Sequence, residues 1–220
     1  MLRRRVMMAI DKCFNGSLFH FDKSFSAVYK DEYGNVWNND GSEVPTISTT
    51  QKKFGTASLS QNNKARLTIN TKLPYQDFTI EAWIYPTATW DDYNWKRIFE
   101  IVGGGLFFAN AISSDYWGNH LYWKPNGTNI YITAETMPRN SWHHVAIVYN
   151  YSTNKAKLYI DGTKQGSEQN VKWNSDKPEY ITLGIGDKTT GSQAYVDEFR
   201  FSKGQVYTSN FTPSDRPFEK

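Results

Sequence analysis

The sequence predicts an all-β fold in which two antiparallel sheets pack face to face. Three observations support this prediction. The aromatic fraction is 16%, with 8 Trp, 14 Tyr and 13 Phe, and aromatic residues favour strands. No window shows the sustained apolar period of about 3.6 residues that marks an amphipathic helix. About a dozen short apolar stretches follow one another at roughly 8–12-residue spacing, separated by Gly, Asn, Asp and Ser, which is typical of a sandwich.

The first half of the chain predicts short strands around one long one. Residues 17–22, SLFHFD, predict the first strand, and the polar, turn-rich residues 30–45 predict a long loop. Two short strands are expected in 53–60 and 64–69. Residues 78–86, FTIEAWIYP, predict the clearest strand because its residues alternate between two faces. One face carries Phe78, Ile80, Ala82 and Ile84, and the other carries Thr79, Glu81, Trp83 and Tyr85.

The second half contains a bend, a hairpin and an irregular tail. The triple glycine at 103–105 predicts a bend between two strands. A hairpin is expected at 142–150 and 155–161, because two apolar stretches flank the polar turn YSTN. Residues 161–166, DGTKQG, predict a further tight turn, and the tail at 209–218 is expected to pack through its two phenylalanines. Further strands are expected within 98–110, 113–127, 128–135, 180–186 and 194–202.

His143 and His144 lie beside Trp142, a pattern that suggests either a metal or catalytic site or a structural role. Neighbours on a strand point to opposite faces, so the two imidazoles cannot bind one ion without breaking the strand. We therefore expect both histidines to be packed and hydrogen-bonded within a central strand. Asp161 and Gly162 likewise predict a turn and not a metal ligand. One face of this strand carries Trp142, His144, Ala146 and Val148, and the other carries His143, Val145, Ile147 and Tyr149.

Charge, cysteine content and hydropathy limit the classes of protein to which this chain can belong. The net charge of +3 is spread along the chain apart from Arg3, Arg4 and Arg5, so the concentrated basic stripe of a nucleic-acid-binding protein is missing. Cys13 is the only cysteine, which excludes an internal disulfide. The apolar run VMMAI is shorter than the roughly 7–15 residues of a secretion signal, and no run approaches the roughly 18 of a membrane span. We expect neither a signal peptide nor membrane insertion.

Four motifs occur in a characteristic order: FTIEAWIYP, WHHVAIVYNYSTNKAKLYIDGTKQG, LGIGD and YVDEFRFSKG. In that order they resemble concanavalin A-like domains of the laminin-G-like and pentraxin type, over residues 17–218. The resemblance implies a jelly-roll sandwich of two antiparallel sheets. We expect an N-terminal arm, residues 1–16, followed by one such domain, residues 17–220. The tail RFSKGQVYTSNFTPSDRPF also resembles versions in tailed-phage structural proteins, such as fibres and particle-surface proteins.

Catalysis is not expected. The same superfamily includes laminarinase-type glycoside hydrolases, which carry Glu-x-Asp-x-x-Glu on one strand and so align nucleophile and acid on one face. This chain contains no Glu-x-Asp, and Glu81 and Glu100 stand alone on their strands. Cys13 lies in the arm without an organised His or Asn partner, and the triple glycine is not followed by the Lys-Ser or Lys-Thr of a phosphate loop.

Two expected loops concentrate aromatic residues beside carboxylates and amides. Sugar rings present apolar C–H faces and a rim of hydroxyls, so aromatic platforms flanked by polar groups suit a carbohydrate ligand. The alternative is that these rings cap the ends of the sandwich or lie in a subunit interface, as in a homo-oligomer. The candidate ligand-binding residues are Trp90, Asp92, Tyr93 and Trp95 in the first loop, and Tyr116, Trp117 and His120 in the second.

The resemblance also implies a structural calcium ion at the edge of a sheet, bound by a carboxylate of the late strand and by backbone carbonyls. The matching carboxylate is Asp197. Alternation puts it on one face with Tyr195, Phe199 and Phe201, so we expect it to be half-buried and to need a partner. The alternative is a carboxylate that is hydrogen-bonded or paired with arginine. The candidate metal ligands are Asp197, Asp22 and Asp187.

Together these observations predict a non-catalytic binding module: a phage particle-surface or fibre protein that recognises cell-surface carbohydrate. Such a protein would lie on the virion surface, outside the cell after release. The alternative is a purely structural virion protein, capsid-decorating or part of a tail, whose arm docks to the particle and whose aromatic loops pack against neighbours. A glycan-cleaving enzyme is the third hypothesis.

Overall fold

The architecture is that of a computed structural model of the whole chain, in which the described part contains strands and turns and no helix that could span a membrane. The described residues are 14–23, 29–61, 64–71, 76–87, 96–101, 104–110, 119–124, 132–171, 180–184 and 193–220. The strands up to the triple glycine are β1 (Ser17–Phe19), β2 (Tyr29–Lys30), β3 (Val36–Asn39), β4 (Thr46–Ser48), β5 (Ser58–Ser60), β6 (Leu67–Asn70), β7 (Phe78–Pro86) and β8 (Lys96–Ile101). Those that follow are β9 (Gly104–Asn110), β10 (Asn119–Lys124), β11 (Ile132–Thr136), β12 (His143–Asn150), β13 (Lys155–Ile160), β14 (Thr163–Asn170), β15 (Tyr180–Leu183) and β16 (Ala194–Lys203).

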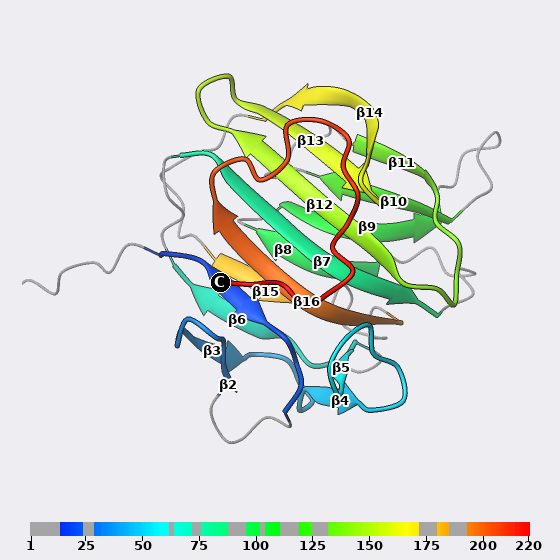
Figure 1. Cartoon of the computed structure of the whole chain (residues 1–220). Helices are drawn as coiled ribbons and strands as arrows, with labels where there is room; N and C mark the ends of the chain where they lie inside the picture. The colour runs from blue at the N-terminus through cyan, green and yellow to red at the C-terminus, as the bar shows by residue number, and fades with distance from the viewer. Residues whose placement is uncertain are drawn as a thin grey trace, which may run out of the picture.

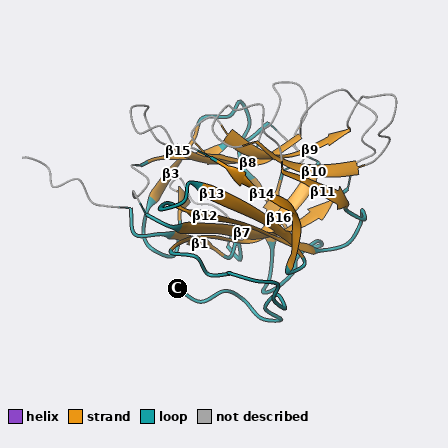
Figure 2. Ribbon diagram, turned by 90° about the horizontal axis from the view of Figure 1, so that it is seen from above, coloured by secondary structure: helices purple, strands orange, loops and turns teal. Residues whose placement is uncertain are grey.

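The strands form two antiparallel sheets that stack as two layers (Figures 1 and 2). In the first sheet the order is β14-β13-β12-β7-β16-β5-β4, and β1 pairs with β16 beside β5. In the second sheet the order is β11-β10-β9-β8-β15-β6-β3-β2. Strands distant in sequence are neighbours in both sheets, as in β7 beside β16. This is the jelly-roll sandwich that the sequence predicts.

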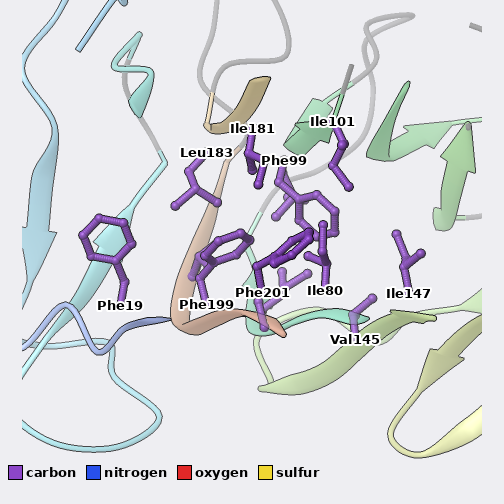
Figure 3. Packing of buried hydrophobic residues seen from close by; sticks show 14 of the residues in the cluster. Phe19, Ile80, Phe99, Ile101, Val145, Ile147, Ile181, Leu183, Phe199 and Phe201 are labelled. Carbon is purple, nitrogen blue, oxygen red and sulfur yellow. The ribbon is translucent and has the colours of Figure 1, made fainter. Parts of the chain in front are cut away.

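The hydrophobic core fills the space between the two inner faces (Figure 3). Each side of this layer presents isoleucine, leucine, valine or phenylalanine, and Phe19 and Trp37 extend the layer through an edge contact between their rings. The residues labelled in Figure 3 come from the first sheet and β1 (Phe19, Ile80, Val145, Ile147, Phe199 and Phe201) and from the second sheet (Phe99, Ile101, Ile181 and Leu183). Burying these side chains is the main favourable contribution to folding.

The two central strands confirm the predicted alternation. β7 and β12 are paired with Ile147 opposite Ile80, and both residues lie in the core. On the outer face of β12, Ala146 and Val148 form a separate small cluster with Tyr159 of β13. The predicted hairpin is also confirmed, because β12 and β13 pair directly across the turn. The strand is covered on both sides, as its two apolar faces predict.

The prediction for the face of Asp197 is wrong. Asp197 pairs with Trp83 on the outer face, whereas Phe199 and Phe201 lie in the core. The register of β16 shifts between Asp197 and Arg200, where Glu198 adopts a left-handed φ of 53°. This β-bulge adds one residue and so moves the following side chains to the other face. The Asp197 side chain is fully buried and not half-buried, with 0% exposure.

Two polar stretches form strands where the sequence predicts none. Residues 30–45 contain β3, and Trp37 from this strand is 1% exposed in the core. Asp161 and Gly162 form the predicted turn, with φ angles of 48° and 76°, but the chain then continues as β14. The side chains of β14 are mostly exposed, so the strand lacks the apolar alternation that would reveal it.

The C-terminal segment, residues 204–220, has no regular structure and crosses the outer face of the first sheet (red in Figure 1). Tyr207 and Phe211 stack with ring centroids 3.5 Å apart and pack on Tyr159. Phe218 joins a second small cluster with Leu18 and Trp83. The prediction that the tail packs through its two phenylalanines is confirmed.

Phe14, which lies within the predicted arm, packs against the core of the sandwich. Phe14 is 4% exposed, and its ring meets that of Phe201 edge to face at 5.0 Å. Residues 1–13 lie outside the described residues. The boundary between an arm, residues 1–16, and the domain stays a prediction.

A buried polar network links the C-terminal segment to the first sheet. Glu81 is 0% exposed on the outer face of β7. Its Oε1 accepts hydrogen bonds from Arg200 Nε and Nη2, at 2.9 and 2.6 Å. Its Oε2 accepts one from Tyr207 Oη at 2.7 Å and lies 3.0 Å from His144 Nε2. Burial raises the pKa of Glu81, but the hydrogen bond with His144 and the charge of Arg200 outweigh burial and hold the pKa below its ordinary value.

Glu81→Gln is expected to lower the free energy of unfolding by about 3 kcal/mol, because it leaves Arg200 partly buried without its counter-ion. Since the folded pKa of Glu81 is depressed, its contribution is present above the pKa of an unfolded glutamate, about 4.3, and is lost as the pH falls through the folded pKa. Urea denaturation at pH 7 and pH 3 should therefore show a difference between wild type and variant that shrinks at low pH. Glu168→Gln, which removes the ion pairs of a more exposed glutamate with Lys155 and Lys157, is the control.

Gly162→Ala is expected to weaken the docking of the C-terminal segment. An added Cβ would overlap the carbonyl oxygen of Phe211, and the φ of 76° is itself unfavourable for alanine. Gly34 has nearly the same φ, 79°, with open space around it. Gly34→Ala should therefore cost only the backbone penalty, about 1 kcal/mol, and Gly162→Ala about 2 kcal/mol more by denaturant titration. Equal losses in the two variants would contradict the assignment of this contact.

Candidate functional site

The first predicted aromatic loop connects β7 of the first sheet to β8 of the second, and the second loop connects β9 to β10 within the second sheet. Trp90, Asp92, Tyr93, Trp95, Tyr116 and Trp117 lie outside the described residues, and of His120 only the backbone, in β10, is described. Lys96 at the start of β8 pairs with Phe108 near the end of β9, and Asn110 pairs with Asn119. The described residues that flank the two loops are thus neighbours.

The first sheet contributes strand ends to the same end of the sandwich. Thr87 N donates to Gln193 O at 3.0 Å where β7 ends and β16 begins. Gln61 connects the layers, because its backbone pairs with Gln193 and its side-chain Nε2 donates to Ile98 O of β8 at 3.0 Å. We call this region the loop end of the sandwich.

Three aromatic side chains lie side by side on the outer face of the first sheet, next to the loop end. Tyr195 of β16 pairs with Tyr85 of β7, with ring centroids 6.1 Å apart. Trp142, directly before β12, lies on the other side of Tyr85 with centroids 5.4 Å apart. All three are partly exposed. We call Tyr195, Tyr85 and Trp142 the aromatic row.

A second set of side chains lies one step further along the same strands. Trp83 of β7 is flanked by His144 of β12 and Asp197 of β16, its partners in the two strand pairings. Residues two apart on a strand are separated by roughly 7 Å, so Trp83 lies about that far behind Tyr85. The Lys53 ammonium lies 3.7 Å from the Trp83 ring centroid. Burial lowers the pKa of Lys53, and the charge of Asp161 opposes this shift.

The turn that carries Lys53 is bound to the sheet by two of the predicted metal ligands. Asp197 Oδ2 accepts hydrogen bonds from the backbone N–H groups of Lys53 and Phe54, at 2.8 and 3.1 Å. Asp22 Oδ1 accepts from the backbone N–H and the hydroxyl of Thr56. Gly55 leaves room for this contact, because a Cβ there would overlap the Asp22 carboxylate. Both aspartates thus position the turn.

Asp197 is surrounded by N–H donors. Its Oδ1 accepts from the backbone N–H of Glu198 at 2.9 Å. Burial raises the pKa of Asp197 to about 7, the charge of Glu198 adds to this, and the backbone hydrogen bonds oppose it. Calcium requires six to eight oxygen ligands, and the described residues contain no group of three or more His, Cys, Asp or Glu side chains that could hold a metal. Asp22 and Asp197 therefore do not by themselves compose a calcium site.

Asp187 lies outside the described residues, and calcium binding stays a prediction. If calcium binds through Asp197, a chelator should lower the melting temperature of the wild type by several degrees, and Asp197→Asn should remove that sensitivity. The measurement is thermal denaturation followed by circular dichroism with calcium and with chelator. Equal melting temperatures for the wild type in both conditions would contradict calcium binding.

The two adjacent histidines have structural partners. His143 Nδ1 lies 2.7 Å from Asp161 Oδ2, and His143 Nε2 lies 2.8 Å from the hydroxyl of Ser141. The backbone N–H of His144 donates to Asp161 Oδ1 at 2.8 Å, and its ring contacts Glu81. Burial raises the pKa of Asp161, but the hydrogen bonds from His143 and His144 outweigh burial and lower it. The prediction that both histidines are packed and hydrogen-bonded is confirmed.

Residues 59–209 match a family model described as the concanavalin A-like lectin/glucanases superfamily. The chain belongs to this superfamily. The match includes all four motifs that carry the resemblance, as well as the aromatic row. No curated protein matches the chain by sequence.

Solved structures of similar fold include both enzyme-associated and toxin domains. Domain 4 of an extracellular arabinanase from Geobacillus stearothermophilus, solved with arabinotriose, is 15% identical with a TM-score of 0.62, covering 87% of this chain and 93% of that one. The binding domain of botulinum neurotoxin DC, solved in complex with SialylT, is 15% identical with a TM-score of 0.56, covering 81% and 46%. Trypanosoma rangeli sialidase is 11% identical with a TM-score of 0.59, covering 87% and 30%. This concanavalin A-like chain thus spans about half of the toxin chain and under a third of the sialidase, and identities this low show the fold alone.

The aromatic row was missed as a site in the sequence analysis, although part of the signal was present. Alternation places Tyr85 and Trp142 on the faces opposite the predicted core, and this is where they lie. Tyr195 joins them because β16 pairs with β7 before the bulge. What the sequence does not show is that β12, β7 and β16 are adjacent, since they are far apart along the chain.

Proposed function

We propose that this concanavalin A-like protein is a non-catalytic carbohydrate-binding module whose ligand site lies at the loop end of the sandwich. The observation that carries the proposal is the aromatic row, three partly exposed rings on β16, on β7 and directly before β12. The rings are tilted against one another, by 59° and 68°, and together they offer a partly exposed apolar platform to the C–H faces of successive sugar units. The predicted loop residues, from Trp90 to Trp95 and from Tyr116 to His120, would add polar and aromatic contacts beside the platform.

The similar structures support a glycan ligand. One of them was solved with arabinotriose and another in complex with SialylT. Two of these proteins, a sialidase and an arabinanase, have names that denote enzymes acting on saccharides. These proteins share a fold but differ in their overall activities. This is expected when a binding site is formed by surface side chains that differ between proteins with a common scaffold.

The contacts of the buried carboxylates support a non-catalytic role. A retaining glycosidase needs two carboxyl groups about 5–5.5 Å apart across an open site. Glu81 is covered by Tyr207 and paired with Arg200, and Asp197 accepts three backbone N–H groups. A catalytic acid or nucleophile must be able to contact the substrate, whereas both of these carboxylates are bound to other groups of the fold.

We further propose that the module acts on the surface of a phage particle, where its glycan ligand would be a cell-surface carbohydrate. This placement is supported by the resemblance of the tail to tailed-phage structural proteins. A purely structural virion protein is the competing role. Particle association that requires residues 1–16, without any glycan binding, would favour that role.

Tyr85→Ala and Trp142→Ala are each expected to weaken glycan binding at least about tenfold, because each removes one ring of the platform. The measurement is a glycan array with the full chain, followed by calorimetry with the glycan that binds best. Trp90→Ala and Trp117→Ala test the predicted loops in the same assay. Tyr151→Ala removes an aromatic side chain that is 43% exposed on the β12–β13 turn, and it should leave binding unchanged.

Unfolding of each variant by urea separates loss of the site from loss of the fold, since Trp142 also packs against the cluster of Leu18, Trp83 and Phe218. If Tyr85→Ala and Trp142→Ala fold like the wild type and bind glycans equally well, the aromatic row is not the site. Release of reducing sugar from a polysaccharide would overturn the non-catalytic assignment.

A further inference from the structure

The Lys53 ammonium is the charged group that lies over the rings behind the aromatic row. It lies 3.7 Å from the Trp83 ring centroid and 5.4 Å from that of Phe54. Among the residues that the structure describes, it makes no hydrogen bond and no ion pair. The neighbouring Lys52 differs, because its ammonium donates to the carbonyl of Thr49 at 3.4 Å.

The carboxylates near Lys53 are already bound to other groups. Asp161, whose charge acts on Lys53, is bound to the His143 ring and to the backbone N–H of His144. Asp197 accepts hydrogen bonds from backbone N–H groups, including that of Lys53 itself. The contact shown for the ammonium is thus with the Trp83 ring, and neither carboxylate is its direct partner.

The position of Lys53 relative to the platform follows from the register. Trp83 lies two residues before Tyr85 on β7, so the ammonium above Trp83 is displaced from the row by roughly 7 Å along the strand. A sugar ring stacked on Tyr85 and Trp142 with an exocyclic group directed along β7 would bring that group to Lys53. A carboxylate is the substituent that gains most from this position, since it forms a charge-assisted hydrogen bond with an ammonium.

We propose that the site selects saccharides that carry a carboxylate, such as uronates or sialates, and that Lys53 binds that carboxylate. This inference rests on the carbohydrate-binding function proposed above. The ion pair would form at a partly buried position, where it is less screened than at the open surface. The burial that lowers the pKa of Lys53 also favours a ligand that supplies a counter-charge.

The test uses matched glycans that differ only in the charged group. The full chain is applied to an array that pairs each sialylated glycan with its desialylated form, and each uronate oligosaccharide with its carboxyl-reduced form. The acidic member of a pair is expected to bind at least about tenfold more tightly. Dissociation constants for the best pair are then measured by calorimetry at low and at physiological salt, and the preference should decrease as salt rises.

The variants separate the charge from the platform. Lys53→Met keeps an apolar stem over Trp83 and should remove the preference for the acidic glycan, while affinity for the neutral form changes less than about twofold. Lys53→Arg should retain the preference, and Lys52→Met is the matched control that should change neither affinity. Tyr85→Ala should weaken both members of the pair, because the platform is common to them.

The possible results distinguish the two proposals. Equal binding of acidic and neutral glycans, with both lost in Tyr85→Ala, would overturn the role of Lys53 and leave the carbohydrate-binding function in place. A preference for acidic glycans that survives in Lys53→Met would also overturn the role of Lys53. If no glycan on the array binds, both proposals fail.

Discussion

The buried carboxylate of Glu81 is the constraint on which the outer face of the first sheet depends. A carboxylate with no exposed surface is stable only if charged and polar groups surround it, and here they come from β12, β16 and the C-terminal segment. Arg200 and His144 supply two partners from the sheet. The hydroxyl of Tyr207 supplies a third, and it fixes the path of residues that have no strand or helix of their own. One side chain thus links two neighbouring strands and the segment that covers them.

The position of the C-terminal segment on the outer face of the first sheet determines which part of that face is accessible to a ligand. Tyr207 and Phe211 lie over the middle of β12 and β13, and Phe218 packs beside Trp83. The turn with Lys53 and Phe54 also packs on Trp83. One step further along the strands, Tyr85 and its neighbours remain partly exposed. The candidate site is thus the part of the outer face that lies beyond both covering segments.

Elements with a clear local sequence pattern could be predicted, and elements without one could not. β7 and β12 were predicted with their faces, because successive side chains of a strand point to opposite faces over the nine residues of β7 and the eight of β12. The bulge in β16 could not be predicted, since one residue, Glu198, takes a left-handed φ without any glycine to indicate it. β14 was missed because its cross-strand pairing with β13, and not an apolar face, makes it a strand. The aromatic row and Lys53 depend on tertiary neighbours, which no local pattern contains.

Side chains carried by strands and side chains carried by loops would contribute differently to ligand binding at such a site. Tyr85 and Tyr195 are carried by strands whose other faces are in the core, so their rings lose little conformational freedom when a ligand binds. Lys53 is likewise positioned before binding, through the hydrogen bond of its backbone N–H to Asp197 and through the contact of its ammonium with the Trp83 ring. Affinity would therefore come from a preformed platform and charge. Loops at the end of the sandwich can differ between members of the superfamily without disturbing the core, which makes them the natural place for selectivity among glycans.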